Sequence, residues 1–354
     1  MRFGLALLGV AALMLSADQA RACGWDTETV FAESTTLPCV YSVVFGRYAK
    51  HTPEYLRARI AAADAALAWS PTAVDALDMK AIAQLRLGEL EPAKKTMLAR
   101  AAIEPEAYAT HANLGTLLTF TGEFEASLKH IDAATKLEPE AHFGREKWHR
   151  ALVVYLRDLQ KDPSLAHRSF VGPAPTEAEL LSGTKATFKG DPRVFDALVS
   201  MIAVYGADGL SHVHYALGEQ LALHGDRPMA FAAFRRAVEL GHPAKKDLEA
   251  LLAKMKKTYW TAEHDYGWEQ DMAGRMSKDY AYWEKTQVAQ GLPVWRDEGV
   301  KAVFDKQHWY SARCLAPEII RDQRAPAGEL PPPKKKEKRP HYEDKPIPLG
   351  GPEP

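Results

Sequence analysis

The side chains with the clearest potential for chemistry are histidines and carboxylates in two short stretches of the chain. His212, His214 and His224 fall in one predicted helix, but the first two point to different faces and His224 lies about three turns further on. The run Glu-His-Asp at 263–265 is also unsuited to catalysis, because neighbouring helical side chains diverge by about 100°. We therefore predict neither a metal ion nor a cofactor.

Other sequence signatures of catalysis are missing. The chain contains no glycine-rich nucleotide-binding motif, no Gly-x-Ser-x-Gly and no His-Glu-x-x-His. Its 45 basic and 46 acidic side chains give a net charge of −1, which argues against a nucleic-acid partner, because such binding relies on neutralising phosphates. The sequence predicts a protein that is not an enzyme and does not bind nucleic acid.

Aromatic side chains are concentrated between Thr258 and Tyr310. We expect this region to form a helical cap, since the last unit of a repeat protein must cover its apolar face. The alternative is a site for sugars or peptides, because aromatic rings line such sites. The tryptophans concerned are Trp260, Trp268, Trp283, Trp295 and Trp309.

The elements that position these residues are predicted by a repeating pattern in the middle of the chain. Leu114 and Leu118 share one helix face, and Gly122 ends that helix before a second apolar stripe begins. Gly115 and Ala134 are small at the points where two antiparallel helices must approach closely. The pattern predicts a helix pair.

Over the segment 108–141 this pattern resembles the tetratricopeptide repeat, whose period is about 34 residues. Further units of the same length are expected near 74–107 and 211–244, and the segment 54–71 has the pattern of a second helix of another unit. The ending of the last unit is similar to Sel1-like repeats. The positions that carry the resemblance in 108–141 are Leu114, Gly115, Leu118, Gly122, Phe124, Ile131, Ala134, Leu137 and Pro139.

The unit at 142–210 is interrupted. Helical patterns cover Phe143–Leu159 and Val194–Tyr205, and an insertion at 160–192 separates them. Thr176 followed by Glu179 predicts a short capped helix within the insertion. We expect the two flanking helices to pack as one antiparallel pair.

The predicted fold class is all-α: a tetratricopeptide-like α-solenoid of antiparallel helix pairs with a helical, aromatic-rich C-terminal cap and a disordered tail. The tail combines many prolines with a lysine run, a composition that does not form a core. The expected organisation is a signal peptide at 1–22, an N-terminal segment at 23–53, the repeat domain at 54–257, the aromatic-rich region at 258–323 and the tail at 324–354.

The resemblance implies a peptide-binding groove lined by the first helix of each unit. The groove would hold its ligand by hydrogen bonds and a few apolar contacts. The version that clamps chaperone C-termini needs Lys and Asn where Asp78 and Ile82 stand, so that ligand is not expected. The implied groove residues are Asp78, Arg86, Asn113, Thr116, Phe120, Phe143, Lys147, His212, Tyr215 and Glu219.

The start of the chain predicts export. Arg2 precedes the uncharged run Phe3–Ser16, and small residues at Ala20 and Ala22 form a cleavage site typical of a secretory signal peptide. This run is shorter than the ~20 residues needed to span a bilayer. We expect a periplasmic or secreted protein without a transmembrane helix in the mature chain.

Export would allow the cysteines to pair. A Cys23–Cys39 disulfide would close a loop worth roughly 3 kcal/mol, and a Cys39–Cys314 disulfide is the rival pairing. A lipid anchor on Cys23 is disfavoured because Arg21 does not fit the sequence that precedes lipidated cysteines.

These observations lead to one main hypothesis for function. The chain is expected to be an exported interaction module or scaffold that binds a protein or peptide partner in the cell envelope. One alternative is an enzyme or carbohydrate-binding protein that uses the aromatic-rich C-terminal region. Another is a structural protein with no discrete ligand.

Overall fold

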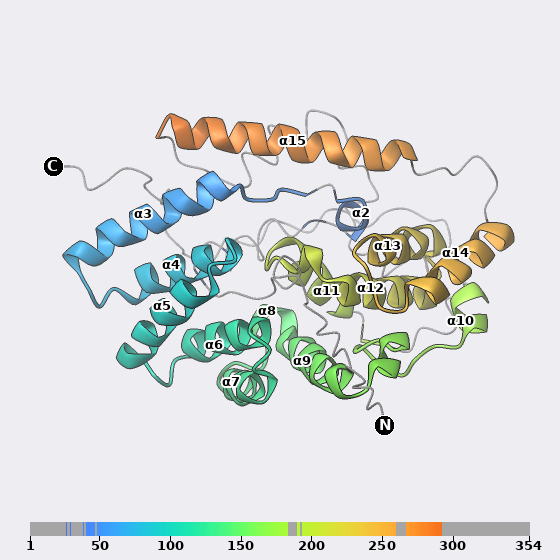
Figure 1. Ribbon diagram of the computed structural model, residues 1–354, viewed down its shortest axis with the longest axis horizontal. Coiled ribbons are helices and arrows are strands. Elements are labelled where there is room, and N and C mark those ends of the chain that lie inside the picture. The colour runs from blue at the N-terminus through green and yellow to red at the C-terminus, as the bar shows by residue number, and fades with distance from the viewer. Residues whose placement is uncertain are drawn as a thin grey trace, which may run out of the picture.

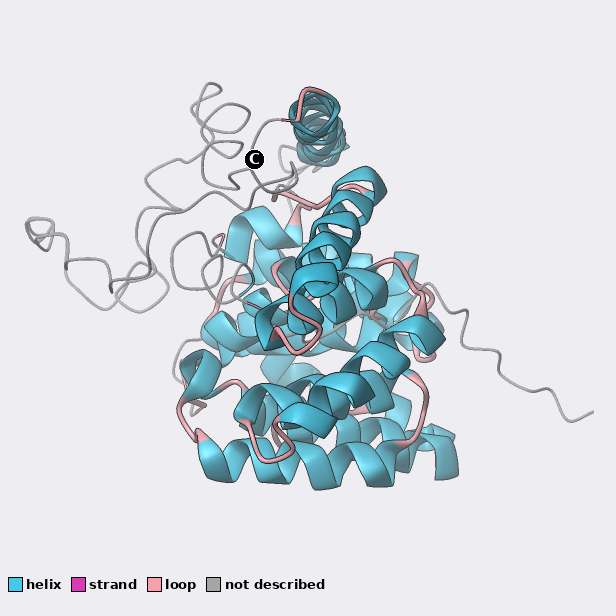
Figure 2. Ribbon diagram, turned by 90° about the vertical axis from the view of Figure 1, so that its left-hand side faces the viewer, coloured by secondary structure: helices cyan, strands magenta, loops and turns pink. Residues whose placement is uncertain are grey.

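The architecture of the chain is seen in a computed structural model, which describes residues 26, 29, 38, 40–46, 48–182, 190–191, 193–259 and 267–291. The predicted signal peptide, the three cysteines, the run 263–265 and the Pro/Lys-rich tail lie outside these residues. The described part consists of helices and loops without strands (Figure 2). None of its helices is both long and apolar enough to cross a bilayer.

Most helices of the described part are 11 to 17 residues long, and five, two of them 3-10 helices, have six residues or fewer. In chain order they are α2 Val40–Val44, α3 Pro53–Trp69, α4 Val74–Arg86, α5 Leu90–Ile103, α6 Tyr108–Phe120, α7 Phe124–Leu137, α8 Ala141–Gly144, α9 Glu146–Lys161, η1 Pro163–His167, α10 Glu177–Ser182, α11 Arg193–Ala203, η3 Ala207–Gly209, α12 Ser211–His224, α13 Arg227–Glu239, α14 Lys245–Tyr259 and the longer α15 Gly267–Ala289.

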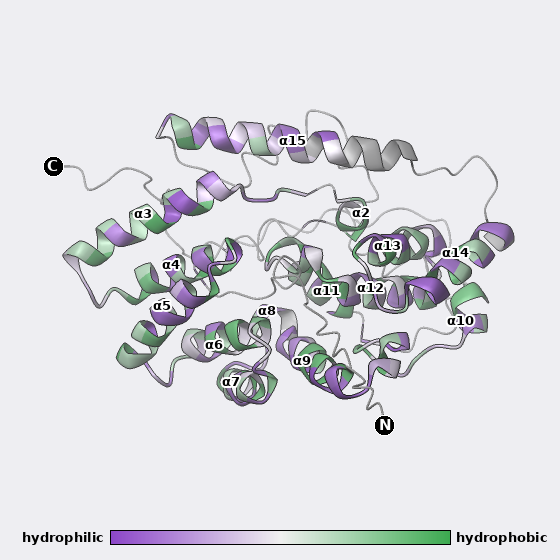
Figure 3. Ribbon diagram, in the orientation of Figure 1, coloured by the Kyte–Doolittle hydropathy of each residue, from purple (hydrophilic) through white to green (hydrophobic). Residues whose placement is uncertain are grey.

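The first stack consists of α3 to α7 and α9. Each of these helices packs on the one before it, from α4 on α3 through to α9 on α7 (Figure 1). Hydrophobic and hydrophilic residues lie next to each other along each helix, as expected where one face packs and another meets water (Figure 3). The prediction of an all-α, solenoid-like fold is confirmed.

Two glycines set the length of the first helix in consecutive units. Gly88 and Gly122, which stand at the same position of their units, have φ angles of 79° and 76°, in the left-handed region that favours glycine. The amide of the residue after each glycine donates back to a carbonyl five positions earlier, from Glu89 to Gln84 and from Glu123 to Leu118. This C-terminal cap makes α4 and α6 end at the same place in their units.

Close helix contact depends on glycine at a second position. A Cβ atom on Gly115 would lie 2.8 Å from Cγ1 of Ile131, and one on Gly218 would lie 2.6 Å from the ring of Phe234. These residues occupy the same positions in 108–141 and 211–244. The prediction that Gly115 allows α6 and α7 to approach closely is confirmed, and α12 and α13 use the same device.

The second stack consists of α11 to α14 and shares a large apolar core with α2 and one face of α9. The expected antiparallel pairing of 143–159 with 194–205 is not observed. Helix α9 packs on α7 and η1, whereas α11 packs on α12, η3, α2 and α8. The predicted cap of α10 is confirmed, since Thr176 Oγ1 accepts from the Glu179 amide and Glu179 Oε2 accepts from the Thr176 amide.

The described helix of the region predicted as a C-terminal cap, α15, packs on α3 and not on the last repeat. Helix α14 packs on α13 at the end of the second stack, but α15 runs back across the molecule to α3 (Figure 1). Trp283 packs against Tyr55 and Leu56, and the buried carboxylate of Glu284 contacts His51 Nδ1 at 2.7 Å and accepts from the Thr52 amide at 2.5 Å. Helix α15 therefore covers the start of α3.

Candidate functional site

Two of the predicted groove residues meet inside the first stack. Asn113 Nδ2 donates to Asp78 Oδ1 at 2.9 Å, which joins α6 to α4. Asp78 also receives Arg100 Nε at 3.1 Å to both carboxylate oxygens. Burial raises the pKa of Asp78 to about 6, against the opposing effect of Arg100 and Asn113. Asp78 therefore balances the charge of the buried Arg100 side chain.

The sequence position of Arg100 explains this arrangement. Arg100 stands where the other units have Ala134 and Ala237, both fully buried. Its guanidinium is 5% exposed and also donates to Thr110 Oγ1. A large cation therefore occupies a small-residue position and requires the acceptors around it.

The other predicted residues of the first stack differ in accessibility. Thr116 is buried, whereas Arg86 and Phe120 are half-buried; Arg86 donates to the Val204 carbonyl and Phe120 packs on the apolar cores of both stacks. Lys147 is exposed, donates to Asp191 at 2.6 Å and lies over the ring of Trp148. Phe143 belongs to α8, and its side chain lies outside the described part.

The remaining predicted residues form a cluster in the second stack. His212 Nδ1 lies 3.2 Å from both Tyr155 Oη and His242 Nε2, and Tyr215 stacks on His242. Burial lowers the pKa of His212 to about 4 and that of His242 to about 3. It raises the pKa of Glu219 to about 7, although hydrogen bonds from Tyr215 and Ser169 oppose the shift.

The structure therefore does not present the predicted residues as one open groove. Asp78, Asn113 and Thr116 are buried in the first stack, and His212, Tyr215 and Glu219 are buried in the second. The sequence pattern correctly placed them on the first helix of each unit, but it could not show how deeply those helices would be covered. Among the described side chains of the set, Lys147 alone is exposed.

The three histidines considered as metal ligands face different surroundings in the structure. His214 Nε2 faces the carbonyl of Asp208 at 3.2 Å, and His224 packs edge-on against Phe195. No group of three potential metal-binding side chains occurs among the residues that the structure describes.

A third polar cluster, at the start of α9, was missed by the sequence reasoning. Glu146 accepts from Arg145 at 3.1 Å and from Tyr108 at 3.2 Å, and its other oxygen lies 3.3 Å from His149 Nδ1. Burial alone would raise the pKa of Glu146, but His149 and Arg145 hold it well below its usual range. The Glu-x-x-His spacing that brings these two side chains together on one helix face was visible in the sequence.

Backbone strain marks the same place. His142 has a φ of 53°, and it is the only non-glycine residue with a positive φ in the described part of the chain. Its Nδ1 atom lies 2.7 Å from Tyr205 Oη, and the guanidinium of Arg145 stacks on the Tyr205 ring at 3.8 Å. The cluster joins α8 and α9 to the end of α11, so it fastens the two stacks to each other.

Accessible apolar side chains occur at one repeated position. Trp69, Ile103 and Leu137 are the last residues of α3, α5 and α7, and successive members are separated by one full repeat. Their exposed fractions are 81%, 38% and 49%. Leu98, also on α5, is 53% exposed. We call these four residues the apolar edge.

The aromatic-rich C-terminal region is only partly described. Tyr280 is fully buried and Trp283 packs near the start of α3, whereas Tyr282 is exposed. Trp260, Trp295 and Trp309 lie outside the described residues, and Trp268 lies on α15 with its side chain outside the described part.

Comparison of the chain with models of protein families, with curated proteins and with solved structures gives no match.

Proposed function

We propose that the protein is an exported, tetratricopeptide-type scaffold that binds a protein or peptide partner in the cell envelope. The observation that supports this function is the apolar edge. Isolated exposed apolar residues are ordinary on protein surfaces, but large ones at an equivalent position of successive units form a repeated feature.

The edge is arranged as a binding surface would be. Helices α3 and α5 both end on the same side of the molecule (Figure 1). A partner that covers Trp69, Ile103 and Leu137 would remove apolar area from water, at about 25 cal/mol per Å². Trp69 is the largest of these side chains and the most exposed, and buried tryptophans often dominate interface energetics.

This proposal changes the surface that the repeat pattern alone implied. The first helices of the units hold their polar residues in buried networks, so a partner cannot reach them without disrupting those networks. The apolar edge lies on the second helices and is reachable as it stands.

Site-specific photocrosslinking in the native envelope tests the proposal. A crosslinking residue at Trp69, Ile103 or Leu137 should give the same discrete adduct, and one at Lys129, an exposed position on α7, should not. The triple replacement Trp69→Ser, Ile103→Ser and Leu137→Ser should abolish the adduct formed from Leu98.

The triple variant should also unfold at nearly the same denaturant concentration as the wild type, since exposed side chains contribute little to stability. Adducts from Lys129 equal to those from the edge, or no adduct from any edge position, would refute the proposal.

A further inference from the structure

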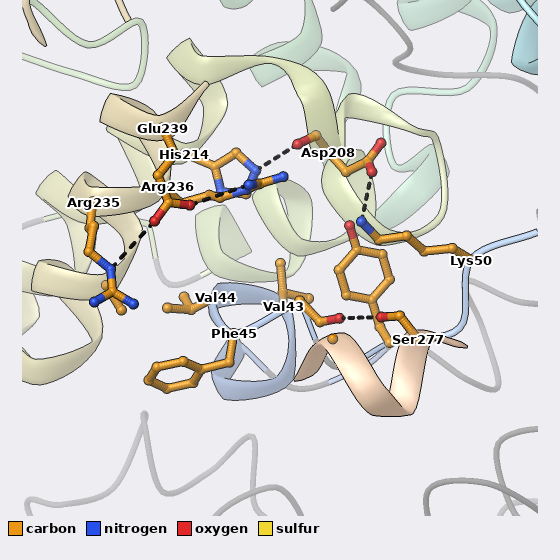
Figure 4. Close-up of a pocket in the computed structure, with 14 residues that line it drawn as sticks. Val43, Val44, Phe45, Lys50, Asp208, His214, Arg235, Arg236, Glu239 and Ser277 are labelled. Carbon is orange, nitrogen blue, oxygen red and sulfur yellow. Dashed lines mark hydrogen bonds and ion pairs between the residues drawn. The ribbon is translucent and has the colours of Figure 1, made fainter. Parts of the chain in front are cut away.

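A cavity of about 320 Å³ lies between the segment 43–50, α13 and α15, and is lined on one side by Val43, Val44 and Phe45 (Figure 4). The other side carries polar side chains from α12, α13 and η3. Its size falls at the lower end of the roughly 300–1,000 Å³ typical of small-molecule sites. One apolar wall facing one polar wall suits a ligand with an apolar body and a polar end.

The polar wall has a surplus of positive charge. Lys50 is paired with Asp208 at 2.9 Å, whereas Arg235 and Arg236 share the single carboxylate of Glu239 at 3.6 Å and 3.4 Å. Among the described residues that line the cavity, three side chains are cationic and two are anionic, which gives a net charge of +1 when His214 is neutral. One negative charge on a ligand would balance it.

Arg235 does not use all of its donors. The distance from Arg235 Nε to Glu239 is too long for a hydrogen bond, and both Nε and Nη2 of Arg235 are buried atoms without a hydrogen-bond partner. Buried guanidinium donors without acceptors are costly, and a carboxylate oxygen would satisfy them.

His214 adds a hydrogen-bond acceptor that lacks a donor. This side chain is 2% exposed, and burial together with Arg236 lowers its pKa to about 4, so it is neutral at neutral pH. Its Nε2 atom faces the Asp208 carbonyl, which can only accept, so the ring proton sits on Nε2. Its Nδ1 atom, which has no partner, is then an acceptor that requires a donor.

We infer that this cavity binds a small hydroxycarboxylate, with its carboxylate on Arg235, its hydroxyl on His214 Nδ1 and its apolar body on Val43, Val44 and Phe45. A dianionic phosphate would exceed the single positive charge of the wall and leave the apolar side unused. An amino acid would bring an ammonium group into a wall that is already positive. This site uses residues separate from the apolar edge, so it stands or falls independently of the proposed scaffold function.

Isothermal titration calorimetry of the full-length protein at pH 7 tests the inference with three isosteric probes and one control anion. The probes are 2-hydroxy-4-methylpentanoate, 4-methylpentanoate and leucine, and the control anion is inorganic phosphate. The hydroxy acid should bind most tightly, and loss of its hydroxyl should raise Kd about 3- to 10-fold.

Two matched arginine variants identify the site. Arg235→Gln should raise the Kd of the hydroxy acid at least ~10-fold, because it removes a charged hydrogen-bonding group. Arg275→Gln, the same change at an exposed position on α15 outside the cavity, should leave Kd unchanged. Circular dichroism checks that both variants remain folded.

Several results would overturn the inference. These are no binding of the hydroxy acid at millimolar concentration, tighter binding of leucine or phosphate, equal binding of 4-methylpentanoate, or equal effects of the two variants.

Discussion

The two stacks of helices bury polar groups in different ways. In the first stack each buried charge faces an opposite charge at about the same distance. The ion pairs are Arg59 with Asp26, Arg100 with Asp78 and Arg145 with Glu146, all at 3.1 Å.

In the second stack one buried cluster of titratable groups, His212, His242 and Glu219, faces neutral partners instead. His212 contacts Tyr155 and His242, and Glu219 has hydrogen bonds from Tyr215 and Ser169, with no cation among the described groups that shift its pKa. The pKa values of His212 and His242 fall and that of Glu219 rises, so burial favours the neutral form of these three groups.

The two stacks differ in how they offset the free-energy cost of removing a charge from water. A charge removed from water must either be paired or be neutralised. The stability of the first stack should therefore depend on both members of each ion pair. The stability that the second stack gains from its neutral cluster should depend on pH.

The largest expected effect breaks a pair in the first stack. Asp78→Ala leaves Arg100 buried without its carboxylate and should lower the free energy of unfolding by about 3–5 kcal/mol. Adding Arg100→Ala should restore at least ~2 kcal/mol, because it removes the orphaned charge and installs the alanine found at Ala134 and Ala237. Urea unfolding of the two single variants and the double variant measures this coupling. Additive losses would show that the pair is not the source of the effect.

The second prediction tests neutralisation in the second stack. Because the pKa of Glu219 is raised to about 7, its protonation favours the folded state, and that stability is lost as pH rises from about 4.5 to about 7. Glu219→Gln cannot ionise. Its free energy of unfolding relative to wild type should therefore increase by about 3 kcal/mol between pH 4.5 and pH 8.

Urea unfolding across this pH range checks the trend, with Glu249→Gln on α14 as the matched change at an exposed carboxyl. A difference between Glu219→Gln and wild type that stays constant with pH would mean that Glu219 is not held neutral by burial.

The smallest expected effect concerns a feature that the stacks share. Gly115→Ala should cost about 1 kcal/mol and Gly218→Ala about 2 kcal/mol, because the new methyl group meets a flexible Ile131 side chain in one case and the rigid Phe234 ring in the other. Thermal unfolding of the two variants measures the difference. Equal or negligible losses would show that the two helix pairs are not packed as closely at Gly115 and Gly218 as these distances indicate.

Much of the fold could be predicted because helix pairs are encoded locally. The repeat period, the breaks at Gly88 and Gly122 and the small residue at Gly115 all involve contacts within one unit or with its neighbour. The residues of the implied groove were also placed on the correct helices, except Phe143, which lies on α8 and not on the helix of Lys147. Their burial could not be predicted, because it depends on which distant segments cover them.

The sequence by itself determined that α4 and α6 end just before Gly88 and Gly122 and that Gly115 must be small, since these follow from backbone geometry and short-range packing. The tertiary structure alone decided that Asp78 forms an ion pair with Arg100, that α9 and α11 do not pack as a pair, and that α15 packs on α3. It also brought Lys50, His214 and Arg235 around one cavity. Such contacts join residues far apart in the chain, and no local pattern of residue types records them.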